Sequence, residues 1–425
     1  AIILSCVASE VAIANDETAF DAITWYVEAY RLMAAFDGVV LITQGDERLY
    51  HEAFGKADYS HDIPMSTENV FRIASLSKQV TQAAIGRLVD NGDLTLDARL
   101  SEFLPAFPSA GQITIRQLID HSAGIAHTNR LDWMDMRITY SLDDIIERLS
   151  QEPLSFPPGE DRQYSNGGYA VLARIIELAS GLTYEAFIDR EFARRGYPSL
   201  GHEAAYAVIP GMVTRYGPGP DYGERVLADT YMTSNRIGGG SLYANAEDVA
   251  RFFRASFGGE LLSAGMTAAL FPTPEDGDIL ITGRSPGALA QIYLDFDDDL
   301  SVVTLSSNSA WPGSFNADVV ALYRGEAVDL EAFDISRVPL DAAEIESITG
   351  DFVADRFGWE WTIVRQADQF AIRHDELHTA FVRTADGEFH APIYDWLCRY
   401  SDYGLEFECR QRDPDATIRF RFTRR

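Results

Sequence analysis

Residues 71–78 read FRIASLSK, and the interpretation of the whole chain starts from this stretch. A helix over about 75–89 would present the Ser75 hydroxyl and the Lys78 amine, at positions i and i+3, on one face within hydrogen-bonding reach. A serine hydroxyl is a weak nucleophile unless a neighbouring base takes its proton, and a desolvated or charge-coupled lysine can be that base. The start of a helix also favours the negative charge of an oxyanion. Ser75 and Lys78 are therefore a candidate nucleophile and base, and an ordinary solvated helix face is the structural alternative.

Lysine is almost absent from the chain. Of the 35 basic side chains only Lys56 and Lys78 are lysines, and all the others are arginines. An arginine side chain does not lose its proton in proteins, whereas a lysine side chain can. The presence of a lysine at position 78 therefore favours a role that needs a removable proton.

The composition excludes several classes of protein. The 425 residues include 65 acidic and 35 basic side chains, which gives a formal net charge of -30. A chain this acidic repels polyphosphates and anionic membrane surfaces, so we expect no nucleic-acid partner. The hydrophobic content of 46% is typical of a globular protein. No apolar run approaches the roughly 18 residues of a membrane-spanning helix.

The hydrophobic pattern predicts a sheet that is interrupted by a long helical region. Helices are expected over 18–36 and 245–253, the second with Asn245 as its N-cap, and strands over 38–43, 48–54, 241–243, 290–296 and 300–306. Residues 93–235 alternate short helices with Pro- and Gly-rich loops and are expected to form a helical lobe. The expected organisation is an N-terminal extension over 1–17, a main domain over 18–326, an acidic linker over 327–341 and a small domain over 342–425.

The C-terminal region is almost wholly alternating β-sequence. Strands are expected over 359–365, 369–373, 379–383, 405–410 and 417–424, which is typical of a small antiparallel barrel or sandwich. Cys398 and Cys409 flank a predicted hairpin turn at Tyr403 and Gly404, which would place the two cysteines opposite each other. A cross-strand disulfide and two reduced, buried thiols both fit this register, and the disulfide would need an oxidising compartment.

Two further segments have alternative interpretations. Residues 374–378, HDELH, have the residue types of a zinc motif without its spacing, so we interpret them as a hairpin turn and expect no metal. Residues 1–14, AIILSCVASEVAIA, fit the end of a secretory signal, a lipoprotein cleavage box at Cys6, or an apolar segment that packs on the body. The first two interpretations favour a periplasmic or secreted protein, and the third is compatible with the cytoplasm.

Several stretches together resemble the serine β-lactamase and penicillin-binding-protein-like hydrolases. Residues 71–78 resemble the nucleophile segment of that family, and the predicted hairpin over 36–55 resembles its opening hairpin. Residues 91–97, 113–124, 156–159 and 164–169 read NGDLTLD, ITIRQLIDHSAG, FPPG and YSNGGY, which resemble further family segments. The resemblance covers about 36–310 and is far more specific than one motif. It implies an α/β fold, a mixed sheet flanked by helices with an all-helical lobe, and an active site in the cleft between them.

The resemblance also implies roles for four residues. Ser75 would be the acylated nucleophile, and Lys78 and Tyr164 would share the general-base and general-acid work. A nearby ammonium would lower the pKa of the Tyr164 phenol, and a phenolate would keep Lys78 charged. Asn166 would hold Lys78 and a polar group of the acyl chain; a helix-capping role is the alternative. His121 is expected to order the helical lobe.

The third motif of the family is altered in this chain. The family has K-T-G or H-x-G on a strand, and the matching residues 281–288 read ITGRSPGA, so Ile281 replaces the expected cation. Gly283 would allow close approach of substrate to the strand, and the Arg284 N–H would be the second oxyanion donor beside that of Ser75. The Arg284 side chain could restore a charge in the site, although we expect it to face solvent.

These observations favour a serine hydrolase that cleaves small esters and needs no cofactor. The missing cation weakens recognition of a substrate carboxylate, and the family VIII carboxylesterase branch tolerates such a replacement. The C-terminal domain resembles the lipocalin-like domains of some members, including D-aminopeptidases. A peptidase or amidase acting on short or D-amino-acid peptides, or a weak β-lactamase, is therefore the enzymatic alternative. A catalytically silent homologue that binds an acyl or peptidyl ligand is the non-enzymatic one.

Overall fold

The structure is a computed structural model that describes most of the chain. The described residues are 19–32, 36–218, 224–308, 315–326, 328, 348–355, 360–366, 369–374, 377–383, 387–391, 396–401, 406–411 and 419–424. The expected N-terminal extension lies outside them, as does the expected linker apart from Val328.

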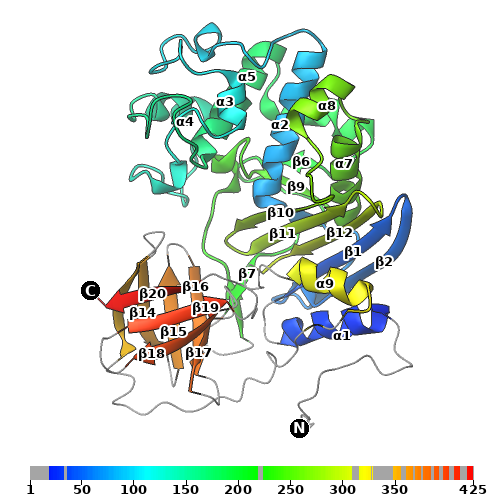
Figure 1. The fold of residues 1–425 in the computed structure, drawn as a ribbon, viewed down its shortest axis with the longest axis vertical. Coiled ribbons are helices and arrows are strands. Elements are labelled where there is room, and N and C mark those ends of the chain that lie inside the picture. Colours follow the sequence, from blue (N-terminus) through cyan, green and yellow to red (C-terminus); the bar gives the residue numbers. More distant parts are fainter. Residues whose placement is uncertain are drawn as a thin grey trace.

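A five-stranded sheet in the order β10-β11-β12-β1-β2 forms the centre of the main domain (Figure 1). Its strands are β1 (Gly38–Gln44), β2 (Glu47–Phe54), β10 (Asp278–Ser285), β11 (Ala288–Asp295) and β12 (Leu300–Ser306). We expected a mixed sheet flanked by helices; the flanking helices are present, and all four strand pairings of this sheet are antiparallel. The sheet brings the beginning of the main domain beside its end, because β1 pairs with β12.

Both faces of this sheet are covered by helices. In β1, Val39 and Leu41 pack into the large core that includes the helical lobe, whereas Val40 and Ile42 pack into a second core on the opposite face. Helix α7 packs on the first face, and α1 and α9 pack on the second. A strand buried on both faces is expected to read as a continuous apolar run, as β1 does.

The helices follow the predicted arrangement. They are α1 (Ala19–Leu32), α2 (Ser77–Asp90), α3 (Ile115–Ile119), α4 (Leu142–Leu149), α5 (Asn166–Ser180), α6 (Tyr184–Glu191), α7 (Ala246–Gly258), α8 (Ala264–Leu270) and α9 (Phe315–Tyr323). The predicted N-cap is confirmed, because the Asn245 side chain accepts a hydrogen bond from the Asp248 N–H at the start of α7. In the part of the chain that the structure describes, no helix has both the length and the apolar character needed to cross a membrane.

Short elements connect the lobe to the sheet. The 3₁₀ turns are η1 (Ala74–Leu76), η2 (Leu100–Glu102), η3 (Thr128–Arg130), η4 (Ala193–Arg195) and η5 (Thr233–Arg236). The short strands are β3 (Lys56–Asp58), β4 (Ile63–Pro64), β5 (Phe71–Arg72), β6 (Gly201–His202), β7 (Tyr216–Pro218), β8 (Arg225–Leu227) and β9 (Leu242–Ala244). Strand β5 leads into η1 and pairs with β9, so the nucleophile segment is tied to a segment more than 160 residues later.

The C-terminal strands form a closed antiparallel barrel, in which β20 pairs back with β13. They are β13 (Gly350–Ala354), β14 (Glu360–Gln366), β15 (Gln369–His374), β16 (Leu377–Arg383), β17 (Phe389–Ala391), β18 (Trp396–Ser401), β19 (Glu406–Gln411) and β20 (Arg419–Arg424). His374 pairs with Leu377 across a hairpin, as interpreted from the sequence; the turn residues lie outside the described ranges. The barrel contacts the main domain where β16 meets β7 (Figure 1).

Aromatic side chains fill the interior of this barrel. The buried core includes Phe352, Trp361, Phe370, Phe381, Phe389, Trp396, Phe407 and Phe422. Cys398 and Cys409 are fully buried among them, lie opposite each other on β18 and β19, and are joined by a disulfide. The structure thus selects the disulfide from the two states that fit the sequence.

We expect Cys398 and Cys409 to resist alkylation until the protein is reduced. A buried disulfide offers no thiol to the reagent, whereas reduced cysteines are modified once the protein is unfolded. Peptide mapping by mass spectrometry after alkylation in denaturant, with and without reductant, measures this. Alkylation of both residues without reductant would contradict the disulfide.

Candidate active site

Ser75 lies in a tight turn between β5 and α2. Within this turn Ala74 adopts the left-handed backbone conformation, with a φ of 45°. That conformation costs a non-glycine residue of the order of 1 kcal/mol, and such strain is often found at functional sites. We expected the helix to begin at about Ser75; α2 begins at Ser77, so Ser75 precedes the helix. The turn, and not the regular helix, presents the hydroxyl group.

Strand β10 lies directly against this turn at Gly283. A Cβ atom on Gly283 would lie 2.5 Å from the Ile73 carbonyl oxygen and 2.8 Å from the Ser75 nitrogen. Only glycine fits such a close approach. We expected Gly283 to allow substrate to approach the strand; in the structure it allows the strand to approach the turn that carries Ser75. The backbone of β10 is therefore held beside the nucleophile.

The direct partner of Ser75 is Tyr164. Their hydroxyl oxygens lie 2.7 Å apart, and either can donate the hydrogen bond. Tyr164 comes immediately before Ser165, the N-cap of α5, whose side chain accepts a hydrogen bond from the Gly168 N–H. The residues at the start of α5 thus place Tyr164 beside Ser75 and Asn166 beside Lys78.

Lys78 is buried beneath this pair, with 3% of its surface exposed. Its amine donates hydrogen bonds to Asn166 Oδ1 at 2.7 Å and to the Gly239 carbonyl oxygen at 2.5 Å. Its Nζ atom lies 4.6 Å from the centre of the Tyr164 ring. Burial lowers the pKa of Lys78 well below the ordinary lysine value, and the charge of Arg236 lowers it further. The environment therefore favours the neutral amine.

The pKa of Tyr164 shifts in the opposite direction from our expectation. Although 45% of the residue is exposed, desolvation raises the pKa of its hydroxyl group, and the hydrogen bond with Ser75 and the charge of Arg236 offset only part of that rise. The expected lowering assumed a charged Lys78, but burial disfavours that charge. A neutral phenol beside a neutral amine is the arrangement that the electrostatics favour.

Two histidines hold the backbone around Tyr164. His121 Nδ1 accepts a hydrogen bond from the Ser165 N–H at 3.2 Å, and His127 Nδ1 accepts one from the Asn166 N–H at 3.1 Å. Burial lowers the pKa of His121 to about 4 and that of His127 to about 3. Both rings are therefore neutral near pH 7, as an accepting nitrogen requires. His121 does order this part of the lobe, as expected, and sequence reasoning missed His127.

Sequence reasoning also missed Gly239, Arg236 and Asn129. The run of three glycines over 238–240 is a signal from which Gly239 could have been found. A Cβ atom on Gly239 would lie 3.1 Å from Asn166 Oδ1 and 3.3 Å from Lys78 Nζ, so a side chain there would crowd the amine. Arg236 and Asn129 lie outside the motif segments in the sequence, and no short sequence pattern identifies them.

Ser75, Lys78 and Tyr164 line one cavity of about 570 Å³. Ile281, at the altered third motif, lines the same cavity together with Leu270 and Pro272. Arg284 also lines it, with intermediate exposure, whereas we expected a solvent-facing side chain. The cavity therefore combines an apolar part with charged side chains, which are Asp120, Arg162 and Arg284.

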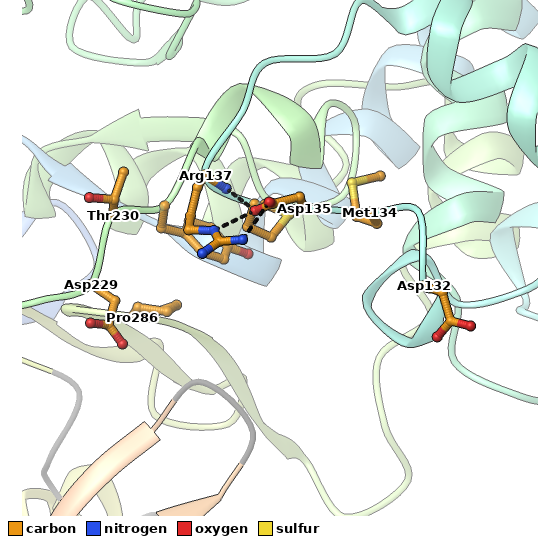
Figure 2. Close-up of a pocket in the computed structure, with 9 residues that line it drawn as sticks. Asp132, Met134, Asp135, Arg137, Asp229, Thr230 and Pro286 are labelled. Carbon is orange, nitrogen blue, oxygen red and sulfur yellow. Dashed lines mark hydrogen bonds and ion pairs between the residues drawn. The ribbon is translucent and has the colours of Figure 1, made fainter.

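A second cavity of about 640 Å³ has a separate set of lining residues (Figure 2). It is lined by Tyr231 and by Pro286 of the β10–β11 turn, and Figure 2 shows the ion pair between Arg137 and Asp135 in its centre. The Tyr231 ring lies 5.3 Å from the guanidinium group of Arg236, so this cavity comes close to the surroundings of Lys78.

No described group of three or more His, Cys, Asp or Glu side chains is placed to hold a metal ion. The chemistry available here belongs to Ser75, Lys78 and Tyr164, which are brought together from η1, α2 and the start of α5.

The beta-lactamase family matches residues 29–319, well over half of the chain. The chain belongs to the beta-lactamase family. This confirms the resemblance found in the sequence and the fold that it implies. The relatives of this chain include a penicillin-binding protein and an esterase, and they belong to the serine hydrolases.

Among curated family members, a penicillin-binding protein of Bacillus subtilis (strain 168) is 32% identical over 253 residues, which cover 56% of this chain and 55% of that protein. The esterase EstB of Burkholderia gladioli is 34% identical over 189 residues, which cover 38% of this chain and 48% of that protein. The chain thus spans about half the length of the curated relatives it matches. The crystal structure of SurE has a TM-score of 0.60 at 19% identity and covers 96% of this chain and 99% of that one, which shows a shared fold.

We expect Gly239→Ala to slow the labelling of Ser75 by a fluorophosphonate about 100-fold. The added methyl group displaces the Lys78 amine, and a displacement of the order of 1 Å is enough to slow such a reaction strongly. Mass spectrometry over time measures the rate. Gly258→Ala is the matched control, since a Cβ atom there meets nothing within 4 Å. Equal labelling rates for the two variants would show that the position of Lys78 does not matter.

Proposed function

We propose that the chain is a serine hydrolase that cleaves ester bonds of small acyl substrates through an acyl-enzyme on Ser75. The observation that carries this proposal is the 2.7 Å hydrogen bond between the hydroxyl groups of Ser75 and Tyr164, beside a buried lysine amine and within a solvent-accessible cavity. A serine becomes nucleophilic when an adjacent group takes its proton.

In acylation, Ser75 Oγ attacks the ester carbonyl carbon, and the Ser75 proton passes to Tyr164 and Lys78. The bond between the carbonyl carbon and the alcohol oxygen then breaks, and the alcohol leaves with that proton. In deacylation, water gives a proton to the same pair and attacks the acyl group, which releases the acid and restores the Ser75 hydroxyl. Because burial lowers the pKa of Lys78, its amine is neutral more often than an ordinary lysine amine, so it is the group that can accept the proton.

The oxyanion of the tetrahedral intermediate would be held by the backbone N–H groups of Ser75 and Arg284. Gly283 supports this assignment, because it lets β10 lie within van der Waals distance of the Ser75 backbone. Two such donors, fixed before the reaction, stabilise negative charge without further rearrangement.

The preference for uncharged esters follows from Ile281. Its side chain lines the cavity at the position where related hydrolases carry a cation, next to the apolar Leu270 and Pro272. Burying a substrate carboxylate against such a surface is unfavourable, whereas an uncharged ester group is tolerated.

The alternative is an amidase or peptidase, and the arginines of the cavity favour it. Arg162 and Arg284 both line the cavity that contains Ser75, and a guanidinium group can bind a carboxylate through two hydrogen bonds. A peptide carboxylate bound there would not need a cation at position 281.

We expect a fluorophosphonate to form an adduct on Ser75, with loss of fluoride and formation of a bond between Oγ and phosphorus. Peptide mass spectrometry locates the adduct, and Ser75→Ala abolishes it. Tyr164→Phe should slow its formation by about 100-fold, since it removes the hydrogen-bonding hydroxyl group. A wild-type protein that stays unmodified would identify the chain as a silent, ligand-binding homologue.

We expect short-chain nitrophenyl esters to be hydrolysed at least about tenfold more efficiently than amino-acid amides, because the site lacks the third-motif cation and an ester is the easier acyl donor. Values of kcat/KM for both classes, with the Ser75→Ala variant as the blank, test the order. Turnover of amides without turnover of esters would reverse it.

A further inference from the structure

Both hydrogen-bond acceptors of Lys78 depend on Arg236. The first acceptor is the Gly239 carbonyl oxygen, and the Gly239 N–H donates to the Arg236 carbonyl oxygen at 2.9 Å. The Gly240 N–H donates to the same oxygen at 2.7 Å. The Arg236 backbone therefore helps to hold the glycine segment, together with the Thr81 hydroxyl group, which donates a hydrogen bond to the Gly238 carbonyl oxygen at 2.6 Å.

The second acceptor depends on the side chain of Arg236. Its Nη1 atom donates a hydrogen bond to Asn129 Oδ1, and Asn166 Nδ2 donates to the same oxygen at 3.0 Å. An asparagine amide has one accepting oxygen and one donating nitrogen. Because Asn129 Oδ1 accepts a hydrogen bond from Asn166 Nδ2, the Asn166 amide is oriented with its oxygen towards Lys78, and the Lys78 amine donates to that oxygen at 2.7 Å.

We propose that Arg236 is a positioning residue that, together with Asn129, fixes both acceptors of Lys78 and so prepares its amine to receive the proton of the Ser75–Tyr164 pair. This inference rests on the proposed function, because it assigns the proton of Ser75 to Lys78. It adds two residues that lie outside the family motifs.

The hydrogen-bond inventory of the amine supports this role. A neutral amine has two N–H bonds and one lone pair, whereas an ammonium group has three N–H bonds. Asn166 and Gly239 accept two of them, and within the described chain the amine makes no third hydrogen bond. The third position therefore suits a lone pair, which can accept a proton.

The charges around Lys78 act in two directions. The rings of Tyr164 and Tyr169, with centres 4.6 Å and 5.3 Å from Nζ, favour an ammonium group. His121 and His127 are neutral near pH 7, because burial lowers the pKa of each well below that range. Burial and, after it, the charge of the Arg236 guanidinium group disfavour a second cation at Lys78.

The surroundings of Arg236 are unusual for a structural arginine. The residue is 7% exposed, and no described carboxylate forms an ion pair with it. Its Nε atom is buried without a hydrogen-bond partner among the described residues. A buried guanidinium group without a carboxylate destabilises a fold, so its retention beside Lys78 favours a functional reason.

The small number of lysines makes a direct test possible. Protein labelled with ¹³C at the lysine Cε atoms gives only two lysine signals, from Lys56 and Lys78, and Lys56→Arg assigns them. The Cε chemical shift follows protonation of the amine, so a pH titration by NMR reports Lys78 without any substrate. In the wild type we expect Lys78 to titrate well below the ordinary lysine range.

Three variants separate the contributions, and thermal unfolding checks that each is folded. Arg236→Met removes the charge and the hydrogen bond, and should raise the pKa of Lys78 by roughly one unit. Arg236→Gln removes the charge but keeps a donor for Asn129, and should give most of the same rise. Asn129→Ala leaves the charge of Arg236 in place, and it should fold normally because Asn129 is exposed. It should lower kcat/KM about tenfold, because Asn166 loses the partner that orients its amide group.

Arg130→Met is the matched control, because Arg130 is an exposed arginine in the same turn as Asn129. It should leave the titration of Lys78 unchanged. An unchanged Lys78 titration in both Arg236 variants, or full activity of Asn129→Ala, would overturn the proposal.

The pH dependence of ester hydrolysis gives a second readout. A higher pKa leaves less neutral Lys78 at a given pH, so the acid limb of the kcat/KM profile should move to higher pH in Arg236→Met. A profile that stays at the wild-type position would count against the role of Arg236. Failure of the proposed function is recognised separately, by the absence of a Ser75 adduct, and the NMR titration of Lys78 still decides the inference in that case.

Discussion

The burial of one lysine amine is the constraint on which the rest of the site depends. Taking an amine out of water is unfavourable unless its hydrogen bonds are replaced, and Lys78 replaces them with Asn166 and Gly239. These partners come from α5 and from the segment before β9, far from Lys78 in sequence. To satisfy one amine, the fold must therefore bring the helical lobe and the sheet together. The same closure places Tyr164 beside Ser75.

Local motifs predicted much of the site, because the chemistry needs particular residues at particular spacings. The four residues to which the resemblance assigns roles, Ser75, Lys78, Tyr164 and Asn166, come together in the structure. The predicted two-residue turn gave the register of Cys398 with Cys409. Arg236 and Asn129 could not be predicted, because they act on Lys78 through other side chains and no spacing rule connects them. The pKa direction of Tyr164 was wrong for a similar reason, since it depends on burial, which a sequence motif does not report.

The altered third motif changes the wall of the cavity without disturbing the nucleophile. Gly283 fixes β10 against the turn of Ser75, while Ile281, two residues earlier on the same strand, lines the cavity. Under the proposed function, one residue of β10 would therefore act on specificity and another on the position of the nucleophile. The C-terminal barrel has a solid aromatic interior, so its influence on the main domain has to act through its outer surface, where β16 contacts β7.

The contrast between the two lysines has a practical consequence. Lys78 is enclosed by the fold, whereas Lys56 lies on the short strand β3 with 40% of its side chain exposed. Amine-reactive dyes, cross-linkers and resins would meet a single lysine on the surface of the described chain. Coupling through Lys56 would attach the molecules at one known lysine, while burial protects the amine of Lys78.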